Sequence, residues 1–264
     1  MKHQFTHHHD TYVIKAGTDA LCDNGKPNEN IMRRLAYQMA KLREQARIIL
    51  VSSGAIGTGR SLLPRKIAKE MWDKKQALSG LGQNDLMGRW TRYFASHGIR
   101  CAQGLVEEND FETDDGRRNM RRTFRQYHEI EDAWGTPIIP IINGNDFVTL
   151  GPIGNDNDRI AAKIAVEVDA LHLVILSDID GLYTGDPDDK SSELIRRVHA
   201  GHYNWRKHVS KGKKSKNGTG GFDTKGAAAE EAALADVLVH IGNSRSRNAI
   251  QRLLQGTIGT TFYK

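Results

Sequence analysis

Residues 218–239 read GTGGFDTKGAAAEEAALADVLV: a run of glycines, a lysine, an alanine-rich segment and a short run rich in valine and leucine. The order of loop, helix and strand is typical of α/β proteins. The free backbone N–H groups at the start of a helix attract anions such as phosphate. The stretch therefore predicts an anion-binding turn that leads into a helix and then into a buried strand.

The spacing in this stretch excludes the two commonest nucleotide-binding loops. A P-loop has glycine directly before its lysine and serine or threonine after it, whereas Thr224 precedes Lys225 and Gly226 follows it. A dinucleotide-binding fingerprint has the pattern G-x-G-x-x-G, and Asp223 stands where its third glycine belongs. The rest of the chain must identify the anion.

Short β-branched segments alternate with amphipathic segments along the rest of the chain. Helical spacing of apolar residues predicts helices, and continuous apolar runs predict buried strands. We expect strands at 11–15, 47–51, 101–106, 136–143, 171–178, 237–241 and 260–264, and helices at 28–46, 74–98, 117–134, 157–170, 223–235 and 245–256. This alternation predicts one α/β domain, residues 11–264, as a three-layer αβα sandwich with a mainly parallel central sheet.

The composition is ordinary for a globular protein, with 38% hydrophobic and 27% charged residues in 264. The longest apolar runs, such as LHLVIL at 171–176, are too short to span a bilayer. The first ten residues lack the apolar core of a secretory signal and are expected to be disordered. Two cysteines form no CxxC motif. We therefore expect a cytoplasmic protein without a membrane partner.

The net charge of +6 is concentrated in residues 206–217, RKHVSKGKKSKN. We expect a mobile basic loop there, which beside an active site would attract a polyanion such as ATP. Aromatic residues do not alternate with the basic ones, and known nucleic-acid-binding motifs are missing, which argues against a nucleic-acid partner.

Charged and polar residues follow several of the expected strands. They are Lys15, 52–54, 143–146 and 177–180, and Lys225 stands at the start of a helix. In parallel sheets these positions meet at one edge, where ligands bind. Two lysines, several carboxylates and glycine-rich turns at one edge indicate phosphoryl transfer, in which a protein positions groups and neutralises charge.

Several of these residues also have a structural interpretation. A lysine at a strand end is often a surface residue, and Asp146 fits an Asx-turn that closes a strand. Asp178 can cap the segment that follows it. Asp156 and Asp158 fit a helix N-cap and first turn, with a secondary role near the substrate.

The motifs, taken together and in order, resemble the amino acid kinase family. The resemblance covers the chain from about residue 11 to the C-terminus. It rests on YVIKAGT, ILVSSGAIGTG, GQNDLMGRW, PIIPIINGNDFV, DNDRIAAKIA, LSDIDGLYTGDP and GTGGFDTK. It implies ATP-dependent phosphorylation of the side-chain carboxylate of L-glutamate to γ-glutamyl phosphate, the first step of proline biosynthesis.

The resemblance implies a catalytic trio of Lys15, Asp146 and Lys225. The two ammonium groups would flank the transferring phosphoryl group and neutralise its oxygens. Asp146 resembles the aspartate that holds the two lysines in place.

The resemblance also implies two binding regions. The substrate glutamate would contact Ser53, Gly54, Ala55, Arg122 and Asn145. The ATP would contact Lys15, Gly17, Ser177, Asp178, Tyr183, Gly218, Thr219, Gly220, Gly221 and Lys225. Mg²⁺ would bridge the β- and γ-phosphates with few protein ligands, so no residue is assigned to a metal.

Arg122 departs from the family pattern, in which many relatives carry Asp or Asn. An arginine cannot accept a hydrogen bond from a substrate ammonium. Either Arg122 turns to solvent, or the substrate is a different carboxylate, a carbamate or a phosphate. A non-catalytic nucleotide sensor is a third alternative, but the presence of both lysines and Asp146 argues against it.

The family resemblance further implies a homodimer or homotetramer, possible coupling to a glutamyl phosphate reductase, and a chain without the C-terminal RNA-binding-like domain of many relatives.

Overall fold

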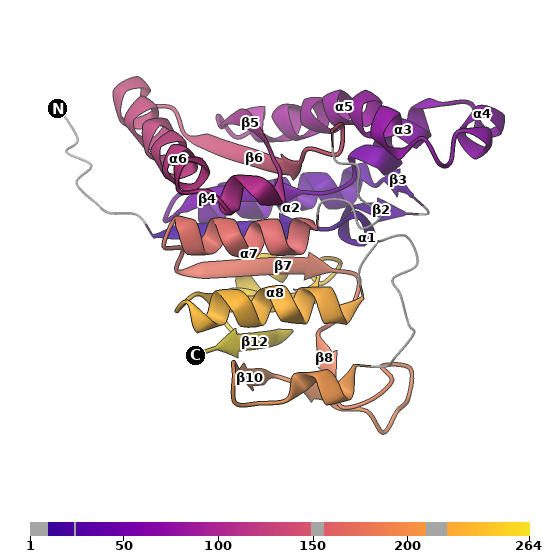
Figure 1. The fold of residues 1–264 in the computed structure, drawn as a ribbon, viewed down its shortest axis with the longest axis vertical. Coiled ribbons are helices and arrows are strands. Elements are labelled where there is room, and N and C mark those ends of the chain that lie inside the picture. Colours follow the sequence, from indigo (N-terminus) through magenta and orange to yellow (C-terminus); the bar gives the residue numbers. More distant parts are fainter. Residues whose placement is uncertain (1–9, 24, 149–155, 210–220) are drawn as a thin grey trace.

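The computed structural model describes residues 10–23, 25–148, 156–209 and 221–264. Its central feature is an eight-stranded sheet in the order β10-β12-β11-β7-β1-β4-β6-β5 (Figure 1). The strands are β1 (Thr11–Ala16), β4 (Arg47–Ser52), β5 (Arg100–Val106), β6 (Ile138–Gly144), β7 (His172–Ser177), β10 (Arg197–His199), β11 (Leu238–Asn243) and β12 (Thr260–Tyr263).

Neighbouring strands of this sheet pair in parallel, except that β11 and β12 are antiparallel. The predicted mainly parallel sheet is therefore confirmed. Because β1, β4, β6 and β7 run in one direction, their carboxyl ends lie at the same edge of the sheet (Figure 1). Two small hairpins lie outside the sheet: β2 (Cys22–Asp23) with β3 (Lys26–Pro27), and β8 (Leu182–Tyr183) with β9 (Leu194–Ile195).

Helices cover both faces of the sheet, as predicted for an αβα sandwich. The main ones are α2 (Glu29–Leu42), α3 (Ala55–Leu62), α5 (Lys75–Ala95), α6 (Asp114–Trp134), α7 (Asn157–Glu167), α8 (Phe222–Leu234) and α9 (Ala249–Leu254). Shorter ones are α1 (Thr18–Leu21), α4 (Arg65–Glu70), and the 3₁₀ helices η1 (Glu108–Phe111) and η2 (Trp205–His208). The expected helix 245–256 is shorter than predicted because Asn248 has a left-handed φ of 50°.

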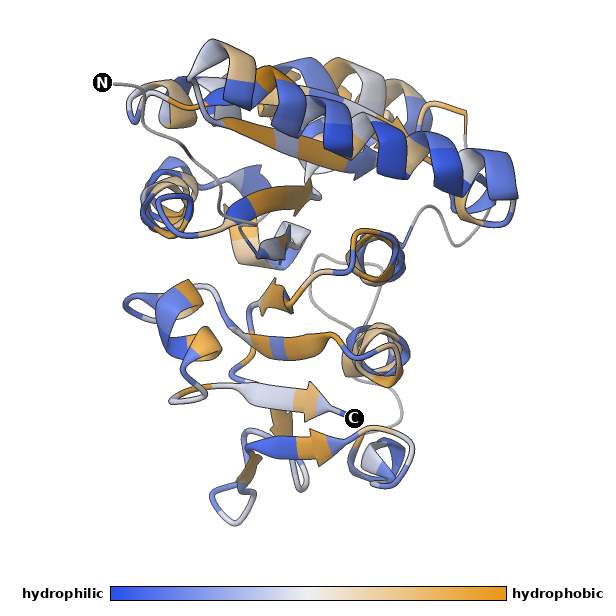
Figure 2. Cartoon of the chain, turned by 90° about the vertical axis from the view of Figure 1, so that its left-hand side faces the viewer, coloured by the Kyte–Doolittle hydropathy of each residue, from blue (hydrophilic) through white to orange (hydrophobic). Residues whose placement is uncertain are grey.

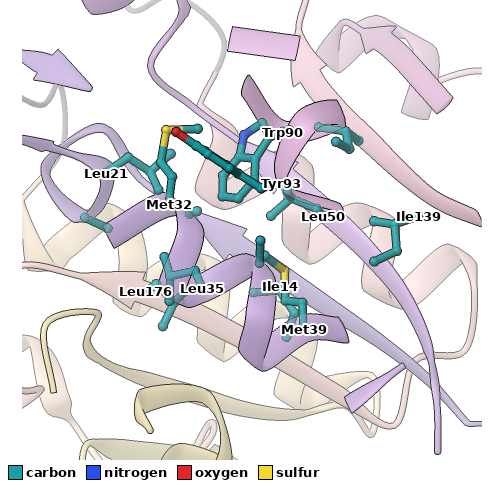
Figure 3. Close-up of a cluster of buried hydrophobic side chains, with 14 of the residues drawn as sticks. Ile14, Leu21, Met32, Leu35, Met39, Leu50, Trp90, Tyr93, Ile139 and Leu176 are labelled. Atoms are coloured by element: carbon teal, nitrogen blue, oxygen red, sulfur yellow. The ribbon is translucent and has the colours of Figure 1, made fainter. Parts of the chain in front are cut away.

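Each face of the sheet has its own hydrophobic core, since successive strand side chains point to opposite faces. Ile14 of β1 packs with α2, α5 and α9 on one face. Val13, the preceding residue, packs with α7 and α8 on the other. The strands in the middle of the sheet are mostly hydrophobic (Figure 2). Figure 3 shows the first core, with Leu35 of α2 beside Leu176 of β7.

A close helix crossing fixes the start of α3, which follows β4. A Cβ atom on Gly59 of α3 would lie 2.0 Å from the carbonyl oxygen of Leu78, and one on Gly82 of α5 would lie 2.0 Å from that of Ala55. Glycines therefore let α3 and α5 approach at backbone distance. This contact holds the β4–α3 turn, where Gly54 has a left-handed φ of 109°.

Two expectations fall partly outside the described residues. The expected disordered N-terminus lies, apart from residue 10, outside the described residues. The stretch expected as a basic loop, 206–217, begins inside η2, and its residues 210–217 also lie outside them.

Candidate active site

Two lysines meet one buried aspartate at the carboxyl edge of the sheet. Nζ of Lys15 lies 2.5 Å from Oδ1 of Asp158, and Nζ of Lys225 lies 3.5 Å from Oδ2 of the same carboxylate. Lys15 and Asp158 are only 5% and 4% exposed. The ion pairs join β1, α7 and α8, so three elements distant in sequence hold one cluster of charge.

Local structure explains how each of these side chains reaches the cluster. Lys15 is the penultimate residue of β1, which lies between β4 and β7 in the middle of the sheet. Gly17 follows, and a Cβ there would lie 3.0 Å from Nζ of Lys15, so the glycine leaves room for the ammonium group. Lys225 is in the first turn of α8, whose N-cap is Gly221.

The carboxylate between the lysines belongs to Asp158, and this corrects the sequence analysis, which put Asp146 there. Asp146 lies in a turn after β6 and is partly exposed. Asp158 lies in the first turn of α7 and shares a face with Ala161, Ala162 and Ala165, all of which are buried. A charged residue on the apolar stripe of a helix is the sequence signal that could have identified it.

The two ammonium groups determine the charge state of Asp158. Burial alone raises the pKa of its carboxyl group, but Lys15 and Lys225 outweigh burial and lower it. The pKa of the neighbouring Asp156 is raised, first by burial and then by the charge of Asp158. Asp156 is the N-cap of α7, where its side chain accepts a hydrogen bond from the N–H of Asp158 (2.9 Å). The capping interpretation of Asp156 is thus confirmed.

An amide network connects the start of α7 to the β4–α3 turn. Nδ2 of Asn157 lies 2.9 Å from both Oγ of Ser53 and Oδ1 of Asn143. Oδ1 of Asn157 accepts a hydrogen bond from the N–H of Gly144 (3.1 Å), and Nδ2 of Asn143 donates one to Gln83 (2.8 Å). Ser53 and Asn143 are among the polar residues predicted for this edge, whereas Asn157 and Gln83 are not predicted, because only the fold brings these four elements together.

Ser53, Gly54 and Ala55 occupy the turn where β4 enters α3, as predicted from the sequence. The N–H of Ser53 donates to the carbonyl of Ala16 at the end of β1 (2.9 Å), so this turn lies next to the strand that carries Lys15. Asn145 lies just after β6, and its Nδ2 donates to Glu107 (3.2 Å). The substrate contacts of these residues remain predictions.

Arg122 lies on an exposed part of α6, and its Nη2 donates to Oδ1 of Asn119 one turn earlier (3.2 Å). This exposure favours the first alternative for Arg122, in which it turns to solvent. Its predicted contact with a substrate remains untested.

Of the expected nucleotide-binding residues, Ser177 and Asp178 lie at the end of β7 and Tyr183 lies in the β8 hairpin that follows it. Ser177, the last residue of β7, is buried, and its hydroxyl donates to Asp178 (3.2 Å). Tyr183 lies in β8, where its hydroxyl donates to Asp180 (3.4 Å). Gly221 precedes α8, whereas Gly218, Thr219 and Gly220 lie outside the described residues.

Two further features of the described residues limit the kind of site. They contain no group of three or more His, Cys, Asp or Glu side chains arranged to hold a metal ion. None of their helices is both long enough and apolar enough to cross a membrane.

The family model for the "Amino acid kinase family" matches residues 10–243. The chain belongs to the amino acid kinase family, and the family inferred from the motifs is confirmed. It is accordingly a kinase.

Among curated relatives, the chain is similar to proteins named glutamate 5-kinase. It is 36% identical to that of Thermoanaerobacter sp. (strain X514) over 254 residues, which are 95% of this chain and 67% of the relative. It is 33% identical to that of Enterococcus faecalis (strain ATCC 700802 / V583) over 261 residues, 96% of this chain and 94% of the relative.

Solved structures of more distant proteins share the fold. The carbamate kinase from Giardia lamblia bound to AMP-PNP gives a TM-score of 0.67 at 13% identity, covering 97% of this chain and 99% of that one. The UMP kinase from Bacillus anthracis gives a TM-score of 0.60 at 16% identity, covering 97% and 96%. At such identities these structures support the three-layer architecture alone.

Proposed function

We propose that this kinase transfers the γ-phosphoryl group of ATP to the side-chain carboxylate of L-glutamate and forms γ-glutamyl phosphate. The observation that carries the proposal is the pair of ammonium groups held by one buried aspartate, Asp158. The names of relatives with up to 36% identity support glutamate as the acceptor. The product would then serve as the activated intermediate of proline biosynthesis.

The proposed chemistry needs charge neutralisation rather than proton transfer. A glutamate carboxylate oxygen attacks the γ-phosphorus in line, the new P–O bond forms, and the bond to the β-phosphate oxygen breaks, which releases ADP. The nucleophile is already ionised at neutral pH, so no general base is required. Lys15 and Lys225 stabilise the charge on the transferring group, the kind of electrostatic contribution that dominates such reactions.

The turn between β4 and α3 is our proposed site for the amino acid. Ser53 presents a hydroxyl held by Asn157, and the N–H groups of the first turn of α3 follow it. Free N–H groups at a helix start bind carboxylates. Asp146 and Asn145, on the turn after β6, would supply acceptors for the substrate ammonium.

Mg²⁺ with the nucleotide fits the residues present. The described residues offer no cage of carboxylates, so the ion would be held mainly by phosphate oxygens and water, as is usual for Mg²⁺. Oδ1 of Asp19, two residues after Gly17, is buried and has no hydrogen-bond partner among the residues that the structure describes, and it would supply one oxygen directly or through water. When bound, the ion neutralises charge on the β- and γ-phosphates.

The direct test is ATP-dependent acyl phosphate formation trapped with hydroxylamine. The panel is L-glutamate, L-aspartate, N-acetylglutamate and acetate. We expect a strong signal with L-glutamate and little with the other three. Absence of signal with L-glutamate from a protein that binds ATP would refute the proposal and direct attention to a different acceptor.

A further inference from the structure

A fully buried tryptophan lies directly on the helix that carries Lys225. Trp205, the first residue of η2, is 0% exposed. An ideal Cβ built on Gly226 of α8 would lie 2.5–2.9 Å from the indole atoms Cζ3, Cη2 and Cε3 of Trp205. No real side chain can approach that closely, so the indole occupies the space that any other residue at position 226 would need.

The contact extends along one face of α8. Phe222, Gly226 and Glu230 are four residues apart and therefore share a face. Phe222 packs edge-on against Trp205 (ring centroids 6.1 Å apart), and Glu230 pairs with Arg206, the next residue of η2 (2.7 Å). Burial alone would raise the pKa of Glu230, but Arg206 and the N–H of Gly201 outweigh it and lower that pKa.

The same segment is attached to the hairpin on the expected nucleotide side. Nδ1 of His208, at the end of η2, lies 3.0 Å from the carbonyl oxygen of Thr184, which directly follows β8. Nε2 of His208 lies 2.8 Å from the hydroxyl of Tyr203. Residues 203–208 thus connect the β8 hairpin to the first turns of α8.

A glycine inside a helix is less favourable than alanine, and Gly226 directly follows Lys225. The packing of the indole against Gly226 offsets the low helix propensity of this glycine. Trp205 also contacts the ring of Phe262 (centroids 6.1 Å apart) and the guanidinium of Arg206 (4.3 Å from the ring centroid). The indole is fully buried and packs against Gly226. It therefore restricts the position of this turn of α8.

We propose that Trp205 is a positioning residue for phosphoryl transfer: its indole, seated on Gly226, fixes the first turns of α8 and thereby the ammonium group of Lys225 beside Asp158. The inference rests on the proposed function for its kinetic meaning. It predicts that disturbing the contact lowers kcat and weakens ATP binding, while the KM for the amino acid changes little.

The test measures three variants: Gly226→Ala, Trp205→Phe, and the double variant that combines these two substitutions. Each is compared with a control variant, Gly88→Ala. Gly88 is an exposed glycine of α5 with open space around its Cβ position, so alanine there is a matched control. In Gly226→Ala we expect kcat to fall by up to about 100-fold, the cost of a small misplacement in an active site. Phenylalanine removes the outer indole ring, so the double variant should recover part of that loss.

Three results would overturn the inference: a kcat in Gly226→Ala within twofold of the wild type, effects of the two substitutions that simply multiply, or a loss of kcat explained by loss of folded protein in thermal unfolding. Affinity for a non-hydrolysable ATP analogue, measured by calorimetry, gives a readout independent of the acceptor. We expect it to weaken about tenfold in Gly226→Ala, as for one misplaced hydrogen bond to a charged group. If the wild type forms no γ-glutamyl phosphate, the proposed function fails, and this affinity still decides the inference.

Discussion

Nζ of Lys15 lies 2.5 Å from Oδ1 of Asp158, and both side chains are almost completely shielded from water. Lys225 approaches the other oxygen of the same carboxylate. One negative charge thus holds two positive ones at the edge of the sheet and leaves the cluster with a net positive charge. Such a cluster suits a phosphoryl group whose oxygens carry negative charge in the transition state.

Asp158→Asn tests this arrangement through stability as well as activity. It leaves the buried ammonium of Lys15 without its counter-charge, and breaking a buried ion pair costs about 3–5 kcal/mol. Urea unfolding should show a loss of that order, and hydroxylamine trapping should show turnover reduced by orders of magnitude. Asp146→Asn is the matched control for the stability measurement alone, because Asp146 is partly exposed. A larger loss of stability in Asp146→Asn than in Asp158→Asn would contradict the assignment.

The difference between Asp146 and Asp158 shows where inference from sequence stops. Both follow an asparagine, in NGND and NDND, and both lie near the edge of the sheet. Which of the two aspartates meets the lysines depends on how α7 is rotated about its axis. This rotation is fixed by the packing of Ile160, Ala161 and Ile164 against the strands. Continuous apolar strands and helical periodicity gave the layers and most of the elements correctly.

Other parts of the site depend on contacts that no local pattern contains. The hydrogen bond from Asn157 to Ser53 joins residues 104 positions apart in the chain. The contact of the Trp205 indole with Gly226 requires that η2 and α8 pack closely together at this glycine. Sequence patterns could identify candidate polar residues but could not determine which of them meet.

Asn157→Ala should weaken binding of the amino acid more than it slows the chemical step. The substitution removes donors to Ser53 and Asn143 and the acceptor for the N–H of Gly144. The orientation of the Ser53 hydroxyl is then lost, and a hydrogen bond to a charged ligand is worth roughly 1.5–3 kcal/mol, or about 10- to 100-fold in KM. Steady-state kinetics with varied L-glutamate measures this change.

Asn84→Ala, on an exposed position of α5, is the control for that measurement and should keep the wild-type KM. An unchanged KM in Asn157→Ala would mean that the amide network only supports the fold and that glutamate binds elsewhere.

Arg122→Asp distinguishes the two alternatives for this departure from the family pattern. Because its side chain is exposed and bonded to Asn119 within α6, we expect the KM for L-glutamate to stay within about twofold of the wild type, as for most surface substitutions. Arg118→Asp on the same helix, also exposed, controls for the change of charge. A large loss of glutamate use confined to Arg122→Asp would show that Arg122 binds the substrate after all.

Stability should decrease below neutral pH because of a buried histidine pair. Nε2 of His240 on β11 lies 3.0 Å from Nδ1 of His172 on β7, and His240 is 4% exposed. Burial and then the neighbouring His172 lower the pKa of His240 to about 3. The unfolded chain, with an ordinary histidine pKa near 6.5, therefore binds a proton that the folded state excludes.

The sign of this linkage is fixed by the lowered pKa. The contribution of His240 is fully present above pH 6.5 and is lost as the pH falls toward 3, by about 2 kcal/mol between pH 7 and pH 5. Urea unfolding at both pH values should show that loss in the wild type and in His97→Gln, since His97 is exposed. In His240→Gln the dependence on pH should be shallower by about the same amount. An equal pH dependence in all three proteins would mean that His240 takes up a proton in the folded state, and the neutral pair between β7 and β11 would have to be abandoned.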